Sequence, residues 1–351
     1  MADMPSVVKG GSRCAPTIRY SLVPELSVDN ASEWLSRAGS PSAGFRFTEL
    51  GGGISNKVVL AEGPDLRAVL KQSLGQLRTA VGWHSERERI LRESSAMRWM
   101  SDQATFGRMH VGRIPRVLFE DPLTFTIAME AAPAGAEMWK TQLFRGELDC
   151  STARTAGATL GSIVSASWQN TDAELLFGDQ TVFEQLRIDP YYRFTAAGRP
   201  EAAQYINRLI RSSATRRVSL VHGDWSPKNL LVSNKDLWVI DWEVIHYGDP
   251  SFDVGFLLNH LLLKSVAMPQ HRAALASLAQ AFIEGLGGRL PPDGLWIVPA
   301  GLEHLAALLL ARVDGKSPAE YLDDGMRERA RSLALSLMRH PAGSLEEIFT
   351  R

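Results

Sequence analysis

Three polar side chains between residues 219 and 255 have the types and spacing needed for phosphoryl transfer. Asp224 follows an apolar pair, Asn229 lies farther along the same segment, and Asp241 ends the last of two further apolar runs. Phosphoryl transfer needs a carboxylate that orients the acceptor hydroxyl, and oxygen ligands for the metal ions that bridge the phosphates. The pattern H-x-D-x-x-x-x-N, followed by a second Asp after the next hairpin, supplies these groups. The spacing therefore predicts Asp224 as the catalytic carboxylate, with Asn229 and Asp241 as Mg²⁺ ligands.

A purely structural explanation exists for each motif taken alone. Gly, Asn and Asp are common in turns, so His-Gly-Asp and Asp-Trp segments often do no more than end strands. The combination favours chemistry, because each polar group adjoins a short apolar run at the required interval. Glu243 would lie on the same side of an extended segment as Asp241, which makes it a candidate metal or substrate contact. His222 is expected to be structural, because Asp224 already supplies the acid–base group.

Residues 45–71 predict an antiparallel meander that would bind phosphates. Alternating side chains predict strands over 45–50, 57–61 and 66–71. The first turn is rich in glycine, so its backbone N–H groups can approach phosphates closely, although an ordinary hairpin turn is the alternative. The candidate phosphate-binding residues in this turn are Gly52, Gly53, Ser55 and Asn56. The third strand ends in Ala-Val-Leu-Lys71, which has the form of the V-A-I-K segment whose lysine holds the α and β phosphates.

A helix over about 85–100 is predicted to supply the partner of Lys71, because kinases pair this lysine with a helical glutamate. Glu93 is the chosen partner, since it flanks the apolar stripe of the helix; Glu86 and Glu88 are the alternatives. The remaining charged residues at the start of this helix, including Arg89, are expected to face water. Further on, strands are predicted over 116–120 and 124–130, and helices over 150–167, 202–212, 252–265, 270–285, 301–314 and 327–338.

Together these motifs resemble the aminoglycoside phosphotransferase and choline kinase superfamily of small-molecule kinases, over about residues 48–315. The methylthioribose kinases look nearest within it. The resemblance implies an α+β, bilobal, protein-kinase-like fold, with a small antiparallel-sheet N-lobe and a larger, mainly helical C-lobe. The expected division is a loose arm over 1–24, a nucleotide-binding lobe over 25–131, and a C-lobe over 132–351 that holds the catalytic loop, metal site and substrate pocket.

The resemblance also implies roles for residues outside the catalytic motif. Backbone groups of Glu130 and Ala132 would bind adenine at the hinge, and Asp253 would pin the catalytic loop. Arg312 stands where methylthioribose kinases carry the second of two substrate-binding arginines, but Ala311 replaces the first. Those enzymes also usually show Asp-Pro-Glu where this chain has Trp242 between its two acids, so methylthioribose itself is a doubtful substrate.

Composition limits the choice of partners. The net charge is −1 and charged residues make up 22% of the chain, which does not indicate a nucleic-acid or anionic-membrane binder. Two cysteines are too few for a disulfide framework, and no run reaches the ~18 uncharged apolar residues of a membrane span. We therefore expect a cytoplasmic monomer or homodimer whose partners are ATP and a small hydroxyl-bearing substrate.

The sequence hypothesis is an ATP- and Mg²⁺-dependent kinase that phosphorylates a hydroxyl of a sugar-like metabolite or an aminoglycoside-type compound. The alternative is a nucleotide-binding regulatory protein with a degenerate kinase fold, against which Lys71, Asp224, Asn229 and Asp241 together argue. A kinase of protein side chains is disfavoured, because the segment between Asp241 and Asp253 is too short for a peptide platform.

Overall fold

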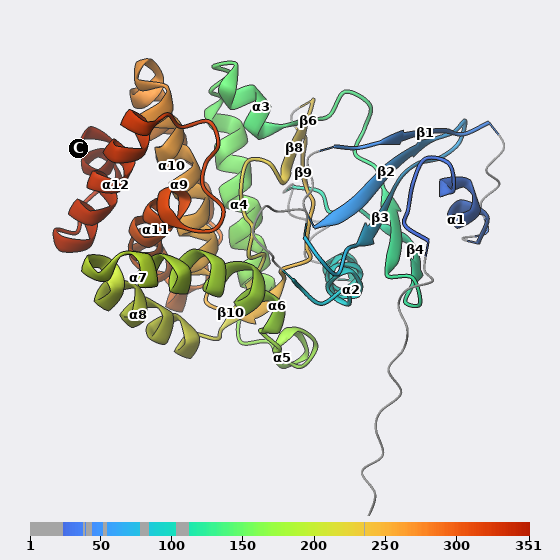
Figure 1. Cartoon of the computed structure of the whole chain (residues 1–351), viewed down its shortest axis with the longest axis horizontal. Coiled ribbons are helices and arrows are strands. Elements are labelled where there is room, and N and C mark those ends of the chain that lie inside the picture. Colours follow the sequence, from blue (N-terminus) through green and yellow to red (C-terminus); the bar gives the residue numbers. More distant parts are fainter. Residues whose placement is uncertain are drawn as a thin grey trace, which may run out of the picture.

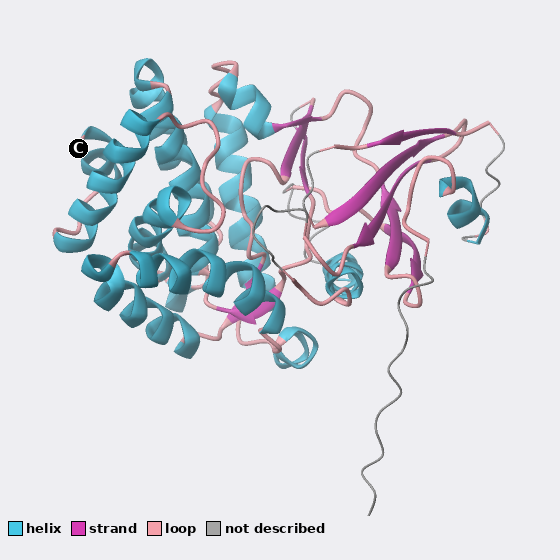
Figure 2. Cartoon of the chain, in the orientation of Figure 1, coloured by secondary structure: helices cyan, strands magenta, loops and turns pink. Residues whose placement is uncertain are grey.

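The computed structural model describes residues 24–37, 39, 44–51, 55–77, 84–102, 112–234 and 236–351. A sheet-containing lobe formed by the first part of the chain stands beside a larger helical lobe (Figures 1 and 2). This arrangement agrees with the predicted α+β bilobal fold. The predicted N-terminal arm falls almost entirely outside the described residues, as do Gly52 and Gly53.

The N-terminal lobe is an antiparallel five-stranded sheet with strand order β1-β2-β3-β5-β4. Its strands are β1 (Arg46–Glu49), β2 (Asn56–Glu62), β3 (Arg67–Ser73), β4 (Val117–Asp121) and β5 (Thr126–Glu130). The first helix, α1 (Ala31–Arg37), packs Trp34 and Leu35 into a small apolar cluster with Val59 and Leu70 of the sheet. The second helix, α2 (Arg89–Asp102), packs with Ile127 and Met129 of β5 in the main core.

The alternation of side chains along β3 decides where Lys71 points. Leu70 belongs to the apolar cluster beneath α1. Because successive side chains in a strand point to opposite faces, Lys71 lies on the other face, together with Val69. That is the face against which α2 packs, so the strand register directs the lysine toward this helix.

The chain changes sheets between Glu130 and Glu137. After β5, the short strand β6 (Glu137–Met138) pairs with β8 (Leu230–Ser233), which pairs in turn with β9 (Asp236–Val239). A separate two-stranded sheet joins β7 (Ser219–Val221) to β10 (His246–Gly248). The loops that carry Asp224 and Asp241 connect these small sheets at the junction of the two lobes (Figure 1).

Helices make up the rest of the C-terminal lobe. In chain order they are α3 (Trp139–Phe144), α4 (Cys150–Ser167), α5 (Thr171–Phe177), α6 (Thr181–Phe183), the π-helix η3 (Glu184–Arg193), α7 (Phe194–Gly198), α8 (Pro200–Thr215), α9 (Ser251–Ala267), the 3₁₀ turn η4 (Pro269–His271), α10 (Arg272–Gly287), the 3₁₀ turn η5 (Pro292–Gly294), α11 (Ile297–Asp314), α12 (Asp324–Arg339) and α13 (Leu345–Thr350). Each of the six helices predicted in this lobe is present. The π-helix was not predicted.

Helices α9 and α11 form the centre of this lobe, and nearly every residue of α9 is buried. The two helices approach closely at Gly255, where an added Cβ would lie 2.6 Å from the carbonyl oxygen of Gly301. Within the described residues, the stretch Pro292–Asp314 is long and apolar enough to cross a membrane, and 67% of its 18-residue apolar window is buried in the protein. A core helix of a soluble protein meets the same test, so this stretch carries no membrane assignment.

Candidate active site

Lys71 connects the two lobes through two carboxylates. Its Nζ lies 2.6 Å from Glu93 Oε2 on α2 and 2.5 Å from Asp241 Oδ1 in the loop after β9. Burial by itself would lower the pKa of Lys71, but Asp241, Glu93 and Glu243 outweigh it and raise this pKa above its usual value. The lysine is therefore an ammonium ion throughout the neutral range. Of the three glutamates considered in the sequence, Glu93 is the one that contacts it.

Asp224 is a buried carboxylate held by two cations. Its Oδ2 lies 2.8 Å from Lys228 Nζ and 3.0 Å from Arg187 Nη2. Although burial opposes ionisation, Lys228 and Arg187 hold the pKa of Asp224 below its usual value. The group is thus an ionised hydrogen-bond acceptor at neutral pH, with one cation from its own loop and one from η3.

The loop that carries Asp224 is fixed by backbone hydrogen bonds to α9. The carboxylate of Asp253 accepts from the N–H groups of His222 and Gly223, at 2.7 and 2.9 Å. The ring of His222 lies between the carbonyl oxygen of Ile240 and the N–H of Asp224, at 3.1 and 3.2 Å, and burial lowers its pKa to about 4. These contacts fit a neutral, structural imidazole.

Two of the predicted metal ligands lie side by side. The N–H of Ile240, next to Asp241, donates to the carbonyl oxygen of Asn229 at 3.0 Å. The amide nitrogen of Asn229 donates to the carbonyl oxygen of Asp224 at 3.0 Å, which leaves its amide oxygen for a cation. Asp241 takes a φ of 69°, in the left-handed region that few residues other than glycine adopt. The amide oxygen and the carboxylate are hard donors of the kind Mg²⁺ prefers.

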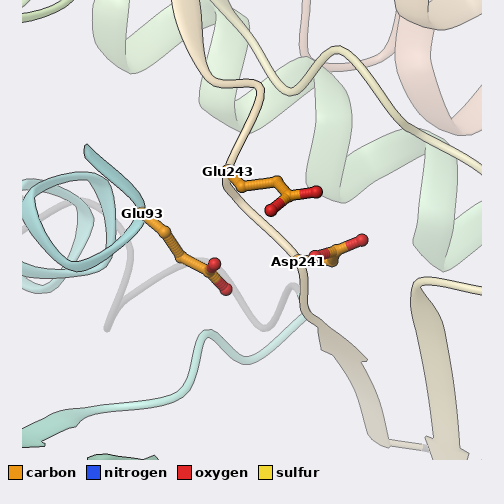
Figure 3. A group of neighbouring side chains, drawn as sticks. All are labelled: Glu93, Asp241 and Glu243. Carbon is orange, nitrogen blue, oxygen red and sulfur yellow. The ribbon is translucent and has the colours of Figure 1, made fainter. Parts of the chain in front are cut away.

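Glu243 belongs to a second group of acids and is held by the N-terminal lobe. Glu93, Asp241 and Glu243 offer oxygen atoms that lie within 4.8 Å of one another (Figure 3). Both oxygens of Glu243 already accept hydrogen bonds: Oε1 from Ser55 at 2.8 Å, and Oε2 from Asn56 at 2.9 Å. The contacts therefore fit Asn229 and Asp241 better than Glu243 as the metal-holding pair.

Arg89 also contacts Glu243, and its burial shows that one prediction from the sequence was wrong. This residue was expected to face water, but it is 1% exposed, and its Nε lies 3.0 Å from Glu243 Oε2. Its guanidinium also donates to the carbonyl oxygens of Ser55, Leu74 and Glu86. The helix starts at Arg89 rather than near residue 85, which places this side chain on the inner face at the junction of the lobes.

The hinge residues lie at the end of the five-stranded sheet. Glu130 is the last residue of β5 and is paired with Ala68. The N–H of Ala131 donates to the carbonyl oxygen of Arg67 at 3.1 Å, and the guanidinium of Arg67 donates to the carbonyl oxygen of Ala132. That carbonyl oxygen already has a donor, so adenine recognition at Glu130 and Ala132 stays a prediction.

Arg312 lies in a cavity of about 120 Å³ that Asp224 also lines. The guanidinium contacts Ser317 and is 3.5 Å from the hydroxyl of Tyr191 on η3. All of the lining residues that the structure describes belong to the C-terminal lobe. Arg312 and Asp224 therefore line one cavity, and Lys71 is not among its described lining residues.

Four charged residues of this region were not assigned to the site from the sequence: Arg89, Arg187, Lys228 and Lys264. Lys228 adjoins Asn229, and its spacing from Asp224 was the available signal. Arg187 lies in a segment that reads as an irregular, proline-containing stretch, which folds as a π-helix. Such helices are rare and often occur at functional sites, so their side-chain directions are difficult to derive from periodicity.

Comparison with known proteins shows the family and the fold of the chain. Residues 46–294 match the model of the phosphotransferase enzyme family. A 4-hydroxytryptamine kinase from Psilocybe cyanescens is 28% identical over 102 residues, a match that spans 24% of this chain and 28% of the fungal kinase.

Solved structures share the fold. An amicoumacin kinase in complex with AMP-PNP and Ca²⁺ has a TM-score of 0.59 and 13% identity, with 90% of this chain and 96% of that chain covered. A choline/ethanolamine kinase family protein from Mesorhizobium loti has a TM-score of 0.52 and 19% identity, with 92% and 99% covered. A spectinomycin phosphotransferase solved with ADP and spectinomycin has a TM-score of 0.52 and 15% identity, with 93% and 98% covered. Because the family model matches well over half of the residues, the chain belongs to the phosphotransferase enzyme family.

Proposed function

We propose that the protein transfers the terminal phosphoryl group of ATP to a hydroxyl of a small molecule, with Mg²⁺ as the metal. The single observation that carries this proposal is the arrangement around the catalytic loop. Lys71, Glu93 and Asp241 form a connected group on one side, and Asp224 borders a cavity on the other. Kinases need these two sides, one for the nucleotide and one for the acceptor.

On the acceptor side, Asp224 would act as the base. Its carboxylate is ionised because Lys228 and Arg187 lie at 2.8 and 3.0 Å, so it can accept a hydrogen bond from the acceptor hydroxyl. As the hydroxyl oxygen bonds to phosphorus, its proton would pass to Asp224, and the bond from phosphorus to the ADP oxygen would break. Asp253 and His222 would keep the carboxylate in place through the loop backbone.

On the nucleotide side, Lys71 would bind phosphate oxygens, with Glu93 orienting its ammonium group. Asn229 and Asp241 would hold the metal, which when bound neutralises negative charge on the phosphates. Ser55 and Asn56 would bring the turn after β1 to this place through Glu243. The solved relatives that contain AMP-PNP or ADP support nucleotide binding in this fold.

An assay of ADP release with ATP and Mg²⁺ tests the proposal. The acceptor panel contains methylthioribose, aminoglycosides, choline, homoserine and simple sugars, and the Asp224→Ala protein serves as the blank. We expect acceptor-dependent ADP release that EDTA abolishes and the variant lacks. ATP binding without ADP release, with this panel and also with hydroxy acids and sugar phosphates as acceptors, would favour the regulatory alternative.

A further inference from the structure

The cavity beside Asp224 is lined by an excess of positive charge. Lys140 of α3, Lys264 of α9 and Arg312 of α11 border it, together with Lys228 of the catalytic loop. The only carboxylate among the lining residues that the structure describes is Asp224. That carboxylate is already paired with Lys228 and with Arg187. The remaining cations therefore face the cavity without acidic partners in its wall.

Lys264 is the most deeply buried of these cations. It is 1% exposed, and its Nζ lies over the rings of Phe144 and Tyr321 at 5.1 and 5.7 Å. Its hydrogen bond to the carbonyl oxygen of His260 is long, at 3.4 Å, and no described acid forms an ion pair with it. Burial, followed by Lys140 and Arg312, lowers the pKa of Lys264 to about 7. A buried charge without a partner is costly, so an anion bound beside Lys264 would stabilise its ammonium form.

Other donors at the cavity also lack acceptors. Arg312 bonds to Ser317 through Nη1, while its buried Nε has no hydrogen-bond partner. The hydroxyl of Tyr321 is buried and likewise has none. The pKa of His260, on the same face of α9 as Lys264, is lowered by burial and by the four cations, so its ring is neutral. The described lining thus presents several donors without partners, and its one carboxylate, Asp224, is already paired.

We propose that this cavity binds an anionic group, a carboxylate or a phosphate, on the molecule whose hydroxyl Asp224 activates. This inference rests on the proposed phosphotransfer to a hydroxyl and narrows the acceptor to anionic alcohols such as hydroxy acids or sugar phosphates. The anion would pair with Lys264 and Arg312 and would satisfy donors that the protein leaves open. Aminoglycosides and choline are cations, and like charge would disfavour them here.

The position of the cavity separates this anion from the phosphates of ATP. Among the described residues, those that line it all belong to the C-terminal lobe, and they do not include Lys71, Asn229 or Asp241. A substrate seated here would direct its hydroxyl at Asp224, while the nucleotide would approach from the side of Lys71. The lysine and arginine at the cavity would then determine which acceptor binds.

The first test is a binding experiment that needs no turnover. The unfolding midpoint is followed against inorganic phosphate and against malonate, at fixed ionic strength, so that general salt effects are constant. Lys264→Met replaces the buried charge with an apolar side chain of similar length, which a folded core tolerates. Lys57→Met, on β2 and paired with Glu49, is the matched control. Lys71→Met tests whether the anion occupies the nucleotide side instead.

We expect a saturable rise in the midpoint for wild type, Lys57→Met and Lys71→Met. In Lys264→Met the apparent affinity should fall about tenfold or more, as expected for the loss of a charged hydrogen bond. A response to malonate alone would show that the site takes a carboxylate, and a response to phosphate alone would show that it takes a phosphate. No response in wild type, or a response lost in Lys71→Met and kept in Lys264→Met, would overturn the inference.

The second test compares gluconate, glucose and glucosamine as acceptors, together with glucose 6-phosphate. Glucose, glucosamine and glucose 6-phosphate are all pyranoses that differ in charge, whereas gluconate is an open-chain acid that supplies a carboxylate; a preference for an anionic member supports the inference. Lys264→Met should raise KM for that acceptor about tenfold and change kcat less. Turnover of glucosamine or glucose in preference to both anions would contradict it. Lys264-dependent anion binding with no phosphotransfer to any acceptor would instead contradict the proposed function and leave the anion site standing.

Discussion

Replacing Arg89 with methionine should destabilise the protein strongly. The guanidinium is buried, lies 3.0 Å from Glu243 Oε2, and also donates to the carbonyl oxygens of Ser55, Leu74 and Glu86. Removing one partner of a buried ion pair typically costs about 3–5 kcal/mol, because the other charge is left uncompensated. Glu243 keeps its hydrogen bond from Asn56 and a second one from Ser55, so we expect about 3 kcal/mol.

A matched control lies on the same helix. Arg98 pairs with Glu120 at 2.7 Å, but its side chain is 50% exposed. The same change to methionine there should cost only about 0–1 kcal/mol, because exposed ion pairs contribute little. The free energies of unfolding of the two variants are compared by urea unfolding, which is monitored by circular dichroism. The comparison requires that the two variants have the same m-value.

The double variant Arg89→Met with Glu243→Gln sharpens the test. Without the carboxylate there is no buried charge to compensate, so the double variant should be more stable than the sum of the two single changes predicts. Two results would refute the reasoning: an Arg89→Met cost no larger than that of Arg98→Met, or strictly additive effects in the double variant.

Two further predictions concern the catalytic loop. Changing Lys228 to Gln removes the main cation that lowers the pKa of Asp224. The acidic limb of the pH profile of kcat/KM should therefore move to higher pH. An unchanged acidic limb would show that Lys228 does not affect the pKa of Asp224. Changing Gly223 to Ala should cost more than the roughly 1–2 kcal/mol of a left-handed alanine, because φ is +76° and the new Cβ would lie 2.7 Å from Val244 Cγ1. Gly135 is the control, because its φ is +85° and an added Cβ would meet nothing within 4 Å. Gly135→Ala should therefore cost only the free energy of placing an alanine in the left-handed region. Equal unfolding midpoints for the two variants would contradict the steric argument.

The family and the fold could be predicted from the sequence because the motifs are local. Asp224, Asn229 and Asp241 each adjoin a short strand, and the interval between them is itself the signal. The family match and the solved relatives confirm the superfamily and the protein-kinase-like fold. Nearness to methylthioribose kinases, the assigned site roles, the oligomeric state and the cytoplasmic location stay predictions.

The contacts that join the two lobes and line the cavity are not local. Arg89 and Glu243 are 154 residues apart, and no helical periodicity shows that the arginine meets a buried acid. The basic cavity is lined by residues of four helices (α3, η3, α9 and α11) and of the catalytic loop, which are far apart in the sequence. Lys264 stands near the end of the helix predicted over 252–265, where a lysine is usually exposed, although the structure buries it.

The most direct test of the central claim is the initial rate of ADP formation by Asp224→Asn, with ATP, Mg²⁺ and an acceptor that the wild-type protein phosphorylates. Equilibrium binding of ATP is measured on the same preparation, because Lys71 and Glu93 are unchanged and should still bind the nucleotide. We expect the rate to fall about 10²-fold or more, as for loss of a catalytic acid–base group, with ATP affinity nearly unchanged. A variant that keeps more than about a tenth of the wild-type rate would contradict the role of Asp224 as the base.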